Sequence, residues 1–143
     1  MIFVDSGAWY ASLIPTDPDH AAAQAWLRQN NEPLLTTDFI MDETLTLLRA
    51  RGQNQRASKL GSAFLDGSAA TFYRITLDEL YDALEVFQRF ADKEWSFTDC
   101  TSKVVMEKLG MTTAFSFDHH FRQFGTVRVV NSASRALTPS TIA

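Results

Sequence analysis

The chain has 143 residues, of which 45% are hydrophobic and 21% are charged, and its formal net charge is −4. This length and composition indicate one globular domain and exclude a disordered or fibrous chain. The single cysteine, Cys100, excludes an intramolecular disulfide and a Cys-x-x-Cys zinc motif. The acidic balance excludes a generic polyanion binder that relies on overall basic charge, so any nucleic-acid contact must come from a local patch.

The N-terminal segment lacks the basic and apolar parts of a secretory signal, because Asp5 interrupts its apolar run. No stretch approaches the ~18 consecutive apolar residues that a membrane span requires. We therefore expect a protein of the reducing cytoplasm that has no membrane association.

Short apolar runs alternate with longer stretches of helical spacing. In chain order, the pattern predicts a strand over Ile2 to Val4, helices over Ala8 to Ile14 and Ala21 to Gln29, a strand over Leu34 to Thr36, helices over Phe39 to Arg51 and Ala57 to Leu65, a strand over Thr71 to Ile75, helices over Leu77 to Phe90 and Phe97 to Leu109, and strands over Thr113 to Phe117 and Val127 to Val130. Continuous apolar strands that alternate with helices predict an α/β fold, with a parallel sheet covered on both faces. Residues 1 to 130 form this domain, and residues 131 to 143 read as a loosely attached polar tail.

Two of the predicted strands end on an aspartate. Asp5 follows the first strand, and Asp118 follows the run "TTAFSF". Ligands of an open parallel sheet bind outside the carboxyl ends of its strands, so both carboxylates are expected at one edge. Each aspartate could instead serve only as a helix N-cap, which contributes about 1 kcal/mol.

Glu43 is harder to explain as a structural residue. In "TTDFIMDETLTLLRAR" its neighbours at helical spacing include Phe39, Ile40 and Leu47, so its side chain is predicted to point inward. An ionised carboxylate on an apolar face is costly unless it is paired, protonated or bound to a metal. A buried ion pair and a metal site therefore both remain open for Glu43.

Asp99 also has two interpretations. Ser96 and Asp99 have the spacing of a capping box, and Lys103 is a natural partner for Asp99 one turn later. If Thr98 opens the helix instead, Asp99 lies in the first turn and faces the same edge of the sheet.

Four converging carboxylates would need a cation between them. Two unit charges about 4 Å apart repel by on the order of 4 kcal/mol at an effective dielectric constant near 20. Hard oxygen ligands without a cysteine and histidine set favour Mg²⁺ or Mn²⁺. Such ions polarise phosphates and activate water, which predicts phosphodiester hydrolysis.

Four segments resemble the successive acidic motifs of PIN-domain proteins, in particular the VapC-type toxins: "FVDSGAWYA", "LLTTDFIMDETLTLLRARG", "DKEWSFTDCTSKVVMEKLG" and "AFSFDHHFRQFG". The resemblance implies a three-layer α/β/α fold with a central parallel five-stranded sheet, and an endoribonuclease that depends on Mg²⁺ or Mn²⁺. It implies that the metal-binding and catalytic acids are Asp5, Glu43, Asp99 and Asp118, with the hydroxyls of Ser6 and Thr98 beside them. It further implies an RNA substrate, a cognate antitoxin of a type II toxin-antitoxin pair, and a homodimer.

Basic residues gather in "RARGQNQRASKLG", which contains Arg49, Arg51, Arg56 and Lys59 and no acid. Arg49 and Arg51 follow the helix of Glu43, so they could contact an RNA backbone. A solvated helical surface is the alternative for this stretch.

His119 and His120 are adjacent, and adjacent helical residues diverge by about 100°, so we expect no shared ion between them. Either could at most orient Asp118 or line the groove.

Three other functions fit part of the pattern. A phosphatase with an aspartyl nucleophile would require a second acid two residues after Asp5, where Gly7 stands. A phosphoryl-accepting receiver would require a lysine at a strand end, where Asn131 stands. A PIN fold that binds RNA or protein without cleaving it remains the alternative to the nuclease, although all four acids are intact.

Overall fold

The computed structural model describes residues 1–125, 128–130 and 138–139. Over these residues the sheet has six strands in the order β3-β2-β1-β4-β5-β6. The parallel strands are β1 (Ile2–Val4), β2 (Leu34–Thr37), β3 (Thr71–Tyr73), β4 (Thr113–Phe115) and β5 (Arg128–Val130). The predicted parallel five-stranded sheet is therefore confirmed. A sixth strand, β6 (Thr138–Pro139), pairs antiparallel with β5. It falls within the predicted polar tail, and the remainder of that tail lies outside the described residues.

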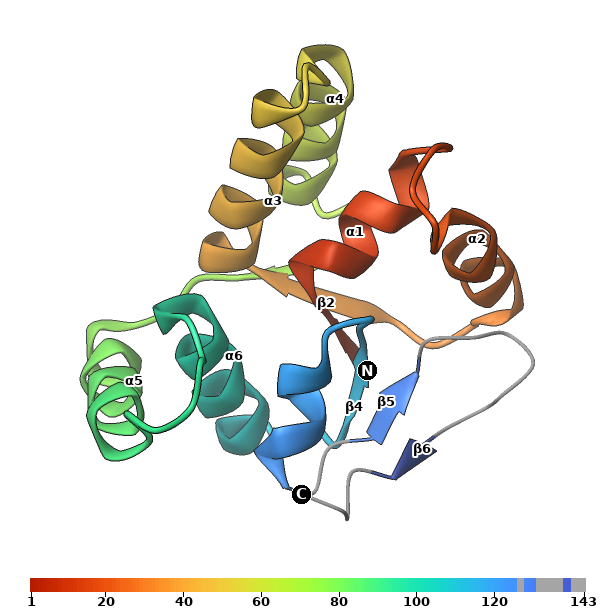
Figure 1. Cartoon of the computed structure of the whole chain (residues 1–143). Coiled ribbons are helices and arrows are strands. Elements are labelled where there is room, and N and C mark those ends of the chain that lie inside the picture. Colours follow the sequence, from red (N-terminus) through yellow and green to blue (C-terminus); the bar gives the residue numbers. More distant parts are fainter. Residues whose placement is uncertain (126–127, 131–137, 140–143) are drawn as a thin grey trace.

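Helices cover both faces of the sheet (Figure 1). One layer holds α1 (Ser6–Leu13), α2 (His20–Gln29), α3 (Asp38–Ala50) and α4 (Asn54–Leu65). The opposite layer holds α5 (Leu77–Arg89), α6 (Phe97–Lys108) and the short 3₁₀ helix η1 (His119–Phe124). This is the predicted α/β/α arrangement. No helix of the described part of the chain is long and apolar enough to cross a membrane.

The central strand β1 explains why the strands are apolar runs. All three of its residues are buried, and Phe3 pairs in register with Leu35 on one side and Ala114 on the other. A strand covered on both faces has no solvent-facing positions, so its side chains do not alternate. Because β1, β2 and β4 are parallel and adjacent, their carboxyl ends meet at one edge.

Polar caps start the helices at that carboxyl edge. Asp5 caps α1, Thr37 caps α3 and Asp118 caps η1, each through its side-chain oxygen. Ser96 caps α6 in a capping box with Asp99. Since a cap must stand where a strand or loop turns into a helix, this chemistry brings several oxygen-bearing side chains to one edge of the sheet.

Candidate metal and RNA site

Asp5 lies at the end of β1 and is only 4% exposed. Its Oδ1 accepts a hydrogen bond from the Ser6 amide at 2.8 Å, and its Oδ2 accepts one from the Ser116 hydroxyl at 3.0 Å. Burial, together with the charges of Asp118 and Asp99, raises the pKa of Asp5 to about 7, and the hydrogen bond from Ser116 opposes this shift. Among the residues that the structure describes, no lysine or arginine pairs with the Asp5 carboxylate to hold it ionised.

Glu43 stands across from Asp5, with the Ser6 hydroxyl between them. This hydroxyl donates to Glu43 Oε1 and lies 3.5 Å from Asp5 Oδ1. Burial raises the pKa of Glu43, the Ser6 bond opposes that shift, and the charges of Asp99 and Asp118 add to it. Glu43 is half-buried at the rim of the site. It does not point into the core, as the sequence suggested, because the buried face of α3 is formed by other residues: Ile40, Thr44 and Leu48.

Asp99 occupies the first turn of α6. Ser96 opens this helix, so the capping-box interpretation is correct and the alternative start at Thr98 is wrong. Asp99 Oδ2 also lies 3.2 Å from His120 Nδ1. Burial raises the pKa of Asp99 although the Ser96 amide donates to it, and the charge of Asp118 raises it further. The expected partner Lys103 pairs with Glu107 instead.

Asp118 is the fourth acid of the site, and His119 and His120 lie beside it. Asp118 Oδ1 accepts a hydrogen bond from the His120 amide at 2.9 Å and lies 3.4 Å from His120 Nδ1. The rings of His119 and His120 lie 4.4 Å apart, and one ligand atom from each of these three residues falls within 4.8 Å of the others. The expectation that the imidazoles would diverge is therefore wrong, because they stand at the start of a 3₁₀ turn and not within an α-helix.

Ser116 joins two of the acids, and sequence reasoning missed it. This fully buried residue follows β4, donates its hydroxyl to Asp5 Oδ2 and accepts the Asp118 amide at 2.9 Å. A serine two residues before a strand-terminal aspartate was the available signal. The backbone carbonyl of Thr98 accepts hydrogen bonds from the hydroxyls of Thr101 and Ser102 in the next turn. The place of the Thr98 hydroxyl beside the acids stays a prediction.

The donor set fits a hard divalent cation. The charge of Asp118 raises the pKa of Asp5, Glu43 and Asp99, and the charge of Asp99 raises the pKa of Asp5 and Glu43. Within the described ranges, no lysine or arginine forms an ion pair with any of the four. The basic groups beside them are imidazoles: His120 approaches Asp99 and Asp118, and His119 lies 3.7 Å from Asp118. Oxygen ligands that repel one another and lack a fixed counter-charge are those that Mg²⁺ or Mn²⁺ satisfies.

A cleft of about 430 Å³ opens beside the acids and is lined by Asp5, Glu43 and Asp118. Tyr10 and Arg51 stand on its wall, with the guanidinium carbon 5.4 Å from the ring centroid of Tyr10. Two further acids line it, Asp17 and Asp19, which the sequence did not single out.

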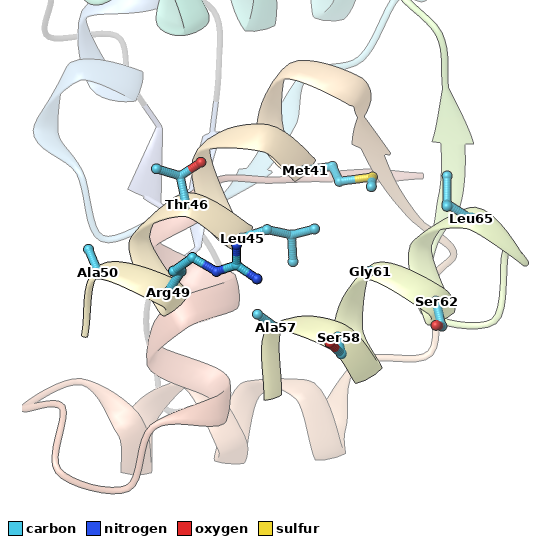
Figure 2. Close-up of a pocket in the computed structure, with 10 residues that line it drawn as sticks. All are labelled: Met41, Leu45, Thr46, Arg49, Ala50, Ala57, Ser58, Gly61, Ser62 and Leu65. Atoms are coloured by element: carbon cyan, nitrogen blue, oxygen red, sulfur yellow. The ribbon is translucent and has the colours of Figure 1, made fainter. Parts of the chain in front are cut away.

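Arg49 lies outside the cleft beside the acids. It donates to Asn54 at 3.3 Å and lines a larger groove of about 660 Å³ between α3 and α4 (Figure 2). The two predicted RNA-contacting arginines thus face different depressions of the surface.

Comparison with known proteins agrees with this geometry. The PIN domain family model matches residues 2–127. The chain is 33% identical over 129 residues to the 23S rRNA-specific endonuclease VapC20 of Mycobacterium tuberculosis, which covers 90% of this chain and 98% of that protein. The crystal structure of VapC20, described as a sarcin-ricin loop cleaving toxin, has a TM-score of 0.76 at 31% identity and covers 82% and 90% of the two chains. A toxin-antitoxin complex from Klebsiella pneumoniae shares the fold, with a TM-score of 0.59 at 12% identity over 83% and 88%.

The fold, the acidic edge and the family match together define the class: the chain belongs to the PIN-domain family. Within that family it is a VapC-type endoribonuclease homologue, as its acidic segments predicted.

Proposed function

We propose that the chain hydrolyses RNA phosphodiester bonds with Mg²⁺ or Mn²⁺ held by Asp5, Glu43, Asp99 and Asp118. The observation that carries this proposal is the coupled set of four carboxylates, in which burial and neighbouring charge raise the pKa of Asp5 to about 7. A folded protein keeps such a set when a bound cation offsets the repulsion. When bound, the metal supplies polarisation of the phosphate and activation of water.

The chain's own residues position the acids. The Ser6 hydroxyl lies between the carboxylates of Glu43 and Asp5 and orients them toward each other. The Ser116 hydroxyl contacts both the Asp5 carboxylate and the Asp118 amide, and so fixes the position of Asp5 relative to Asp118. His120 stands between Asp99 and Asp118 and orients both. Hydroxyls and imidazoles that orient metal-binding carboxylates tune metal affinity without binding substrate.

Of the basic residues in the described part of the chain, Arg51 is the best placed to contact RNA near the acids. It shares the cleft with them, and Tyr10 holds its guanidinium through a ring contact and a hydrogen bond from Nη1 to the phenol oxygen at 3.4 Å. A fixed guanidinium suits a phosphate oxygen. Arg49 remains a predicted RNA contact, with no position in this cleft to support it.

The relatives suggest the substrate and a partner. VapC20 is a 23S rRNA-specific endonuclease, so ribosomal RNA is the substrate class we propose first. A toxin-antitoxin complex shares the fold, and we propose that a cognate antitoxin neutralises this chain as well. We also propose that the protein acts in the cytoplasm, as a ribosomal RNA substrate would require. A member that binds RNA or protein without cleaving it is the second candidate, but all four acids being present favours cleavage.

The test is cleavage of purified 23S rRNA and of a synthetic sarcin-ricin loop hairpin, with Mg²⁺, with Mn²⁺ and with EDTA. We expect metal-dependent cleavage by the wild type, which Asp99→Asn abolishes. Asp66→Asn is the matched control, because Asp66 is an exposed aspartate at the end of α4. Binding of RNA without cleavage by the wild type would support the second candidate and refute the first.

A further inference from the structure

Two imidazoles stand beside the four acids, although a Mg²⁺ or Mn²⁺ site does not require them. His119 and His120 open the 3₁₀ helix η1, directly after Asp118. Mg²⁺ and Mn²⁺ prefer carboxylate, carbonyl and water oxygens, whereas imidazole nitrogen suits Zn²⁺, Cu²⁺ and Ni²⁺. The chain has 3 histidines, so most of its imidazoles lie next to one acid of the site. The start of η1 therefore carries ligands for a second class of cation.

The ligand atoms of these three residues lie close together. Nδ1 of His120 lies 3.4 Å from Asp118 Oδ1, and Nδ1 of His119 lies 3.7 Å from the same oxygen. One ligand atom from each residue falls within 4.8 Å of the others. In a tetrahedral zinc site, bonds of about 2.0 to 2.1 Å put neighbouring ligand atoms about 3.3 Å apart. Both separations from Asp118 are therefore close to those of a zinc site.

The side chains that must adjust are the exposed ones. The side chains of His119 and Asp118 are 71% and 37% exposed, so both can turn without displacing core residues. The ring of His120 is only 16% exposed and lies against Asp99. One fixed and two adjustable ligands can thus close around an ion. Three protein ligands with water in the fourth position are a common arrangement for zinc.

A structural role accounts for His120 but not for His119. His120 Nδ1 lies 3.2 Å from Asp99 and 3.4 Å from Asp118, so its ring orients both carboxylates. The 3.7 Å between His119 Nδ1 and Asp118 exceeds a hydrogen-bond distance. An exposed charge pair of this kind contributes little to stability. His119 is therefore the residue that separates a metal site from a structural pairing.

The geometry points to a transition-metal site: we propose that Asp118, His119 and His120 bind Zn²⁺, with water in the fourth position. This site differs in its ligands from the set of four carboxylates but shares Asp118 with it. Zn²⁺ bound here takes the Asp118 carboxylate from the Mg²⁺ or Mn²⁺ site and the His120 imidazole from Asp99. Zn²⁺ is therefore an inhibitor of cleavage. The inhibition rests on the proposed function, whereas Zn²⁺ binding does not.

The first test is calorimetric titration of Zn²⁺ into the metal-free full chain. His119→Ala should weaken Zn²⁺ binding by about tenfold or more, because even a partner that only orients a metal ligand is worth about 10- to 100-fold in affinity. The Mn²⁺ affinity of this variant should equal that of the wild type, since His119 is not one of the four acids. Equal Zn²⁺ affinity in both proteins would overturn the proposal. An equal loss of Zn²⁺ and Mn²⁺ affinity would also overturn it, because it would show a structural role.

The matched control is His20→Gln, which removes the third histidine of the chain. His20 begins α2, and its Nδ1 lies 2.7 Å from the Ala11 carbonyl oxygen. This variant should bind Zn²⁺ like the wild type. A loss as large as that in His119→Ala would place the ion elsewhere and refute the proposed ligands. Circular dichroism of each variant confirms that it is folded.

A second measurement uses Co²⁺ as a spectroscopic substitute for Zn²⁺. Four-coordinate Co²⁺ with nitrogen ligands absorbs strongly in the visible range, whereas six-coordinate Co²⁺ held by carboxylates and water absorbs weakly. We expect strong absorption for the wild type and weak absorption for His119→Ala. Weak absorption for both proteins would contradict the imidazole ligands.

Inhibition is measured by adding Zn²⁺ to the Mg²⁺-dependent cleavage of the sarcin-ricin loop hairpin. Without Zn²⁺ the wild type and His119→Ala should cleave equally, and half-inhibition of the variant should require about tenfold more Zn²⁺. Equal inhibition would show that Zn²⁺ acts by replacing Mg²⁺ among the four acids, and would overturn the inhibitory role of the histidines. If the wild type cleaves no RNA, the proposed function fails, and the Zn²⁺ titrations still decide whether this site exists.

Discussion

Replacing Asp5 with asparagine is expected to stabilise the metal-free protein at pH 8, although it should abolish cleavage. The Asp5 carboxyl is 4% exposed and has neighbouring carboxylates but no lysine or arginine partner among the described residues. At pH 8 the wild type must therefore fold around an ionised group that its surroundings disfavour. Asparagine keeps the size of the side chain and its acceptor for the Ser6 amide while removing the charge.

The magnitude follows from the pKa of Asp5, which burial raises from 3.8 to about 7. Between these pH values the folded protein holds a proton that the unfolded chain has released, so the free energy of unfolding decreases as the pH rises through this window. The loss above pH 7 is on the order of 4 kcal/mol. Asparagine weakens the bond from Ser116 at a cost of about 1 kcal/mol, so a net gain of about 3 kcal/mol remains. For a chain of this size it corresponds to a rise in Tm of about 10 °C.

Thermal unfolding followed by circular dichroism in EDTA, at pH 8 and at pH 5, measures this difference. We expect Asp5→Asn to unfold at a higher temperature at pH 8 and to lose most of its advantage at pH 5, where wild-type Asp5 is protonated. The exposed control Asp66→Asn should differ little from the wild type at either pH. A lower Tm for Asp5→Asn at pH 8 would refute the reasoning and favour a role of Asp5 as a helix cap alone.

Three further substitutions test separate parts of the structure. Ser116→Ala should lower Mn²⁺ affinity about tenfold, measured by calorimetry, because it removes the hydrogen bond to the Asp5 carboxylate and the acceptor of the Asp118 amide. Arg51→Ala should weaken RNA binding and reduce its logarithmic salt dependence by about 1, measured by fluorescence anisotropy with EDTA present. Burial alone would raise the pKa of Glu79, but donors including Lys108 lower it to about 2. Glu79→Ala should therefore cost about 2 kcal/mol in urea unfolding at pH 7, and less at pH 3, because the wild-type advantage is lost as the pH falls from about 4.5 toward 2.

Most of the fold could be predicted because each element has a local cause. The β1 run is apolar since both faces of its strand are covered, and the polar residues that follow it begin a helix. Asp5 shows that a cap and a site residue need not be alternatives, since one oxygen accepts the Ser6 amide while the carboxylate faces the other acids. Asp99 and Asp118 combine the two roles in the same way.

Contacts between distant elements could not be predicted from local patterns. Ser116 reaches Asp5 only because β4 lies beside β1, with Phe115 opposite Val4. Arg49 lies in the last turn of α3, whereas Arg51 is the C-cap residue at which the helix ends. The two side chains line different depressions of the surface, which a simple count of basic residues overlooks.

The sequence also did not predict that α5 carries an exposed apolar stripe, which is formed by Leu77, Tyr81, Leu84 and Phe87. Helical spacing predicts an apolar face, but it does not say which apolar residues meet the core. Glu79 is buried by Tyr73, Thr76 and Lys108, which draws that side of α5 inward and leaves Tyr81 outside.

The central claim is that four carboxylates form one divalent-cation site. Calorimetric titration of Mn²⁺ into the metal-free wild type tests it most directly, alongside the single variants Asp5→Asn, Glu43→Gln, Asp99→Asn and Asp118→Asn. The account predicts that the wild type binds Mn²⁺ and that each of the four substitutions weakens binding about tenfold or more, while Asp66→Asn leaves it unchanged. Equal Mn²⁺ affinity in the wild type and all four variants would contradict it.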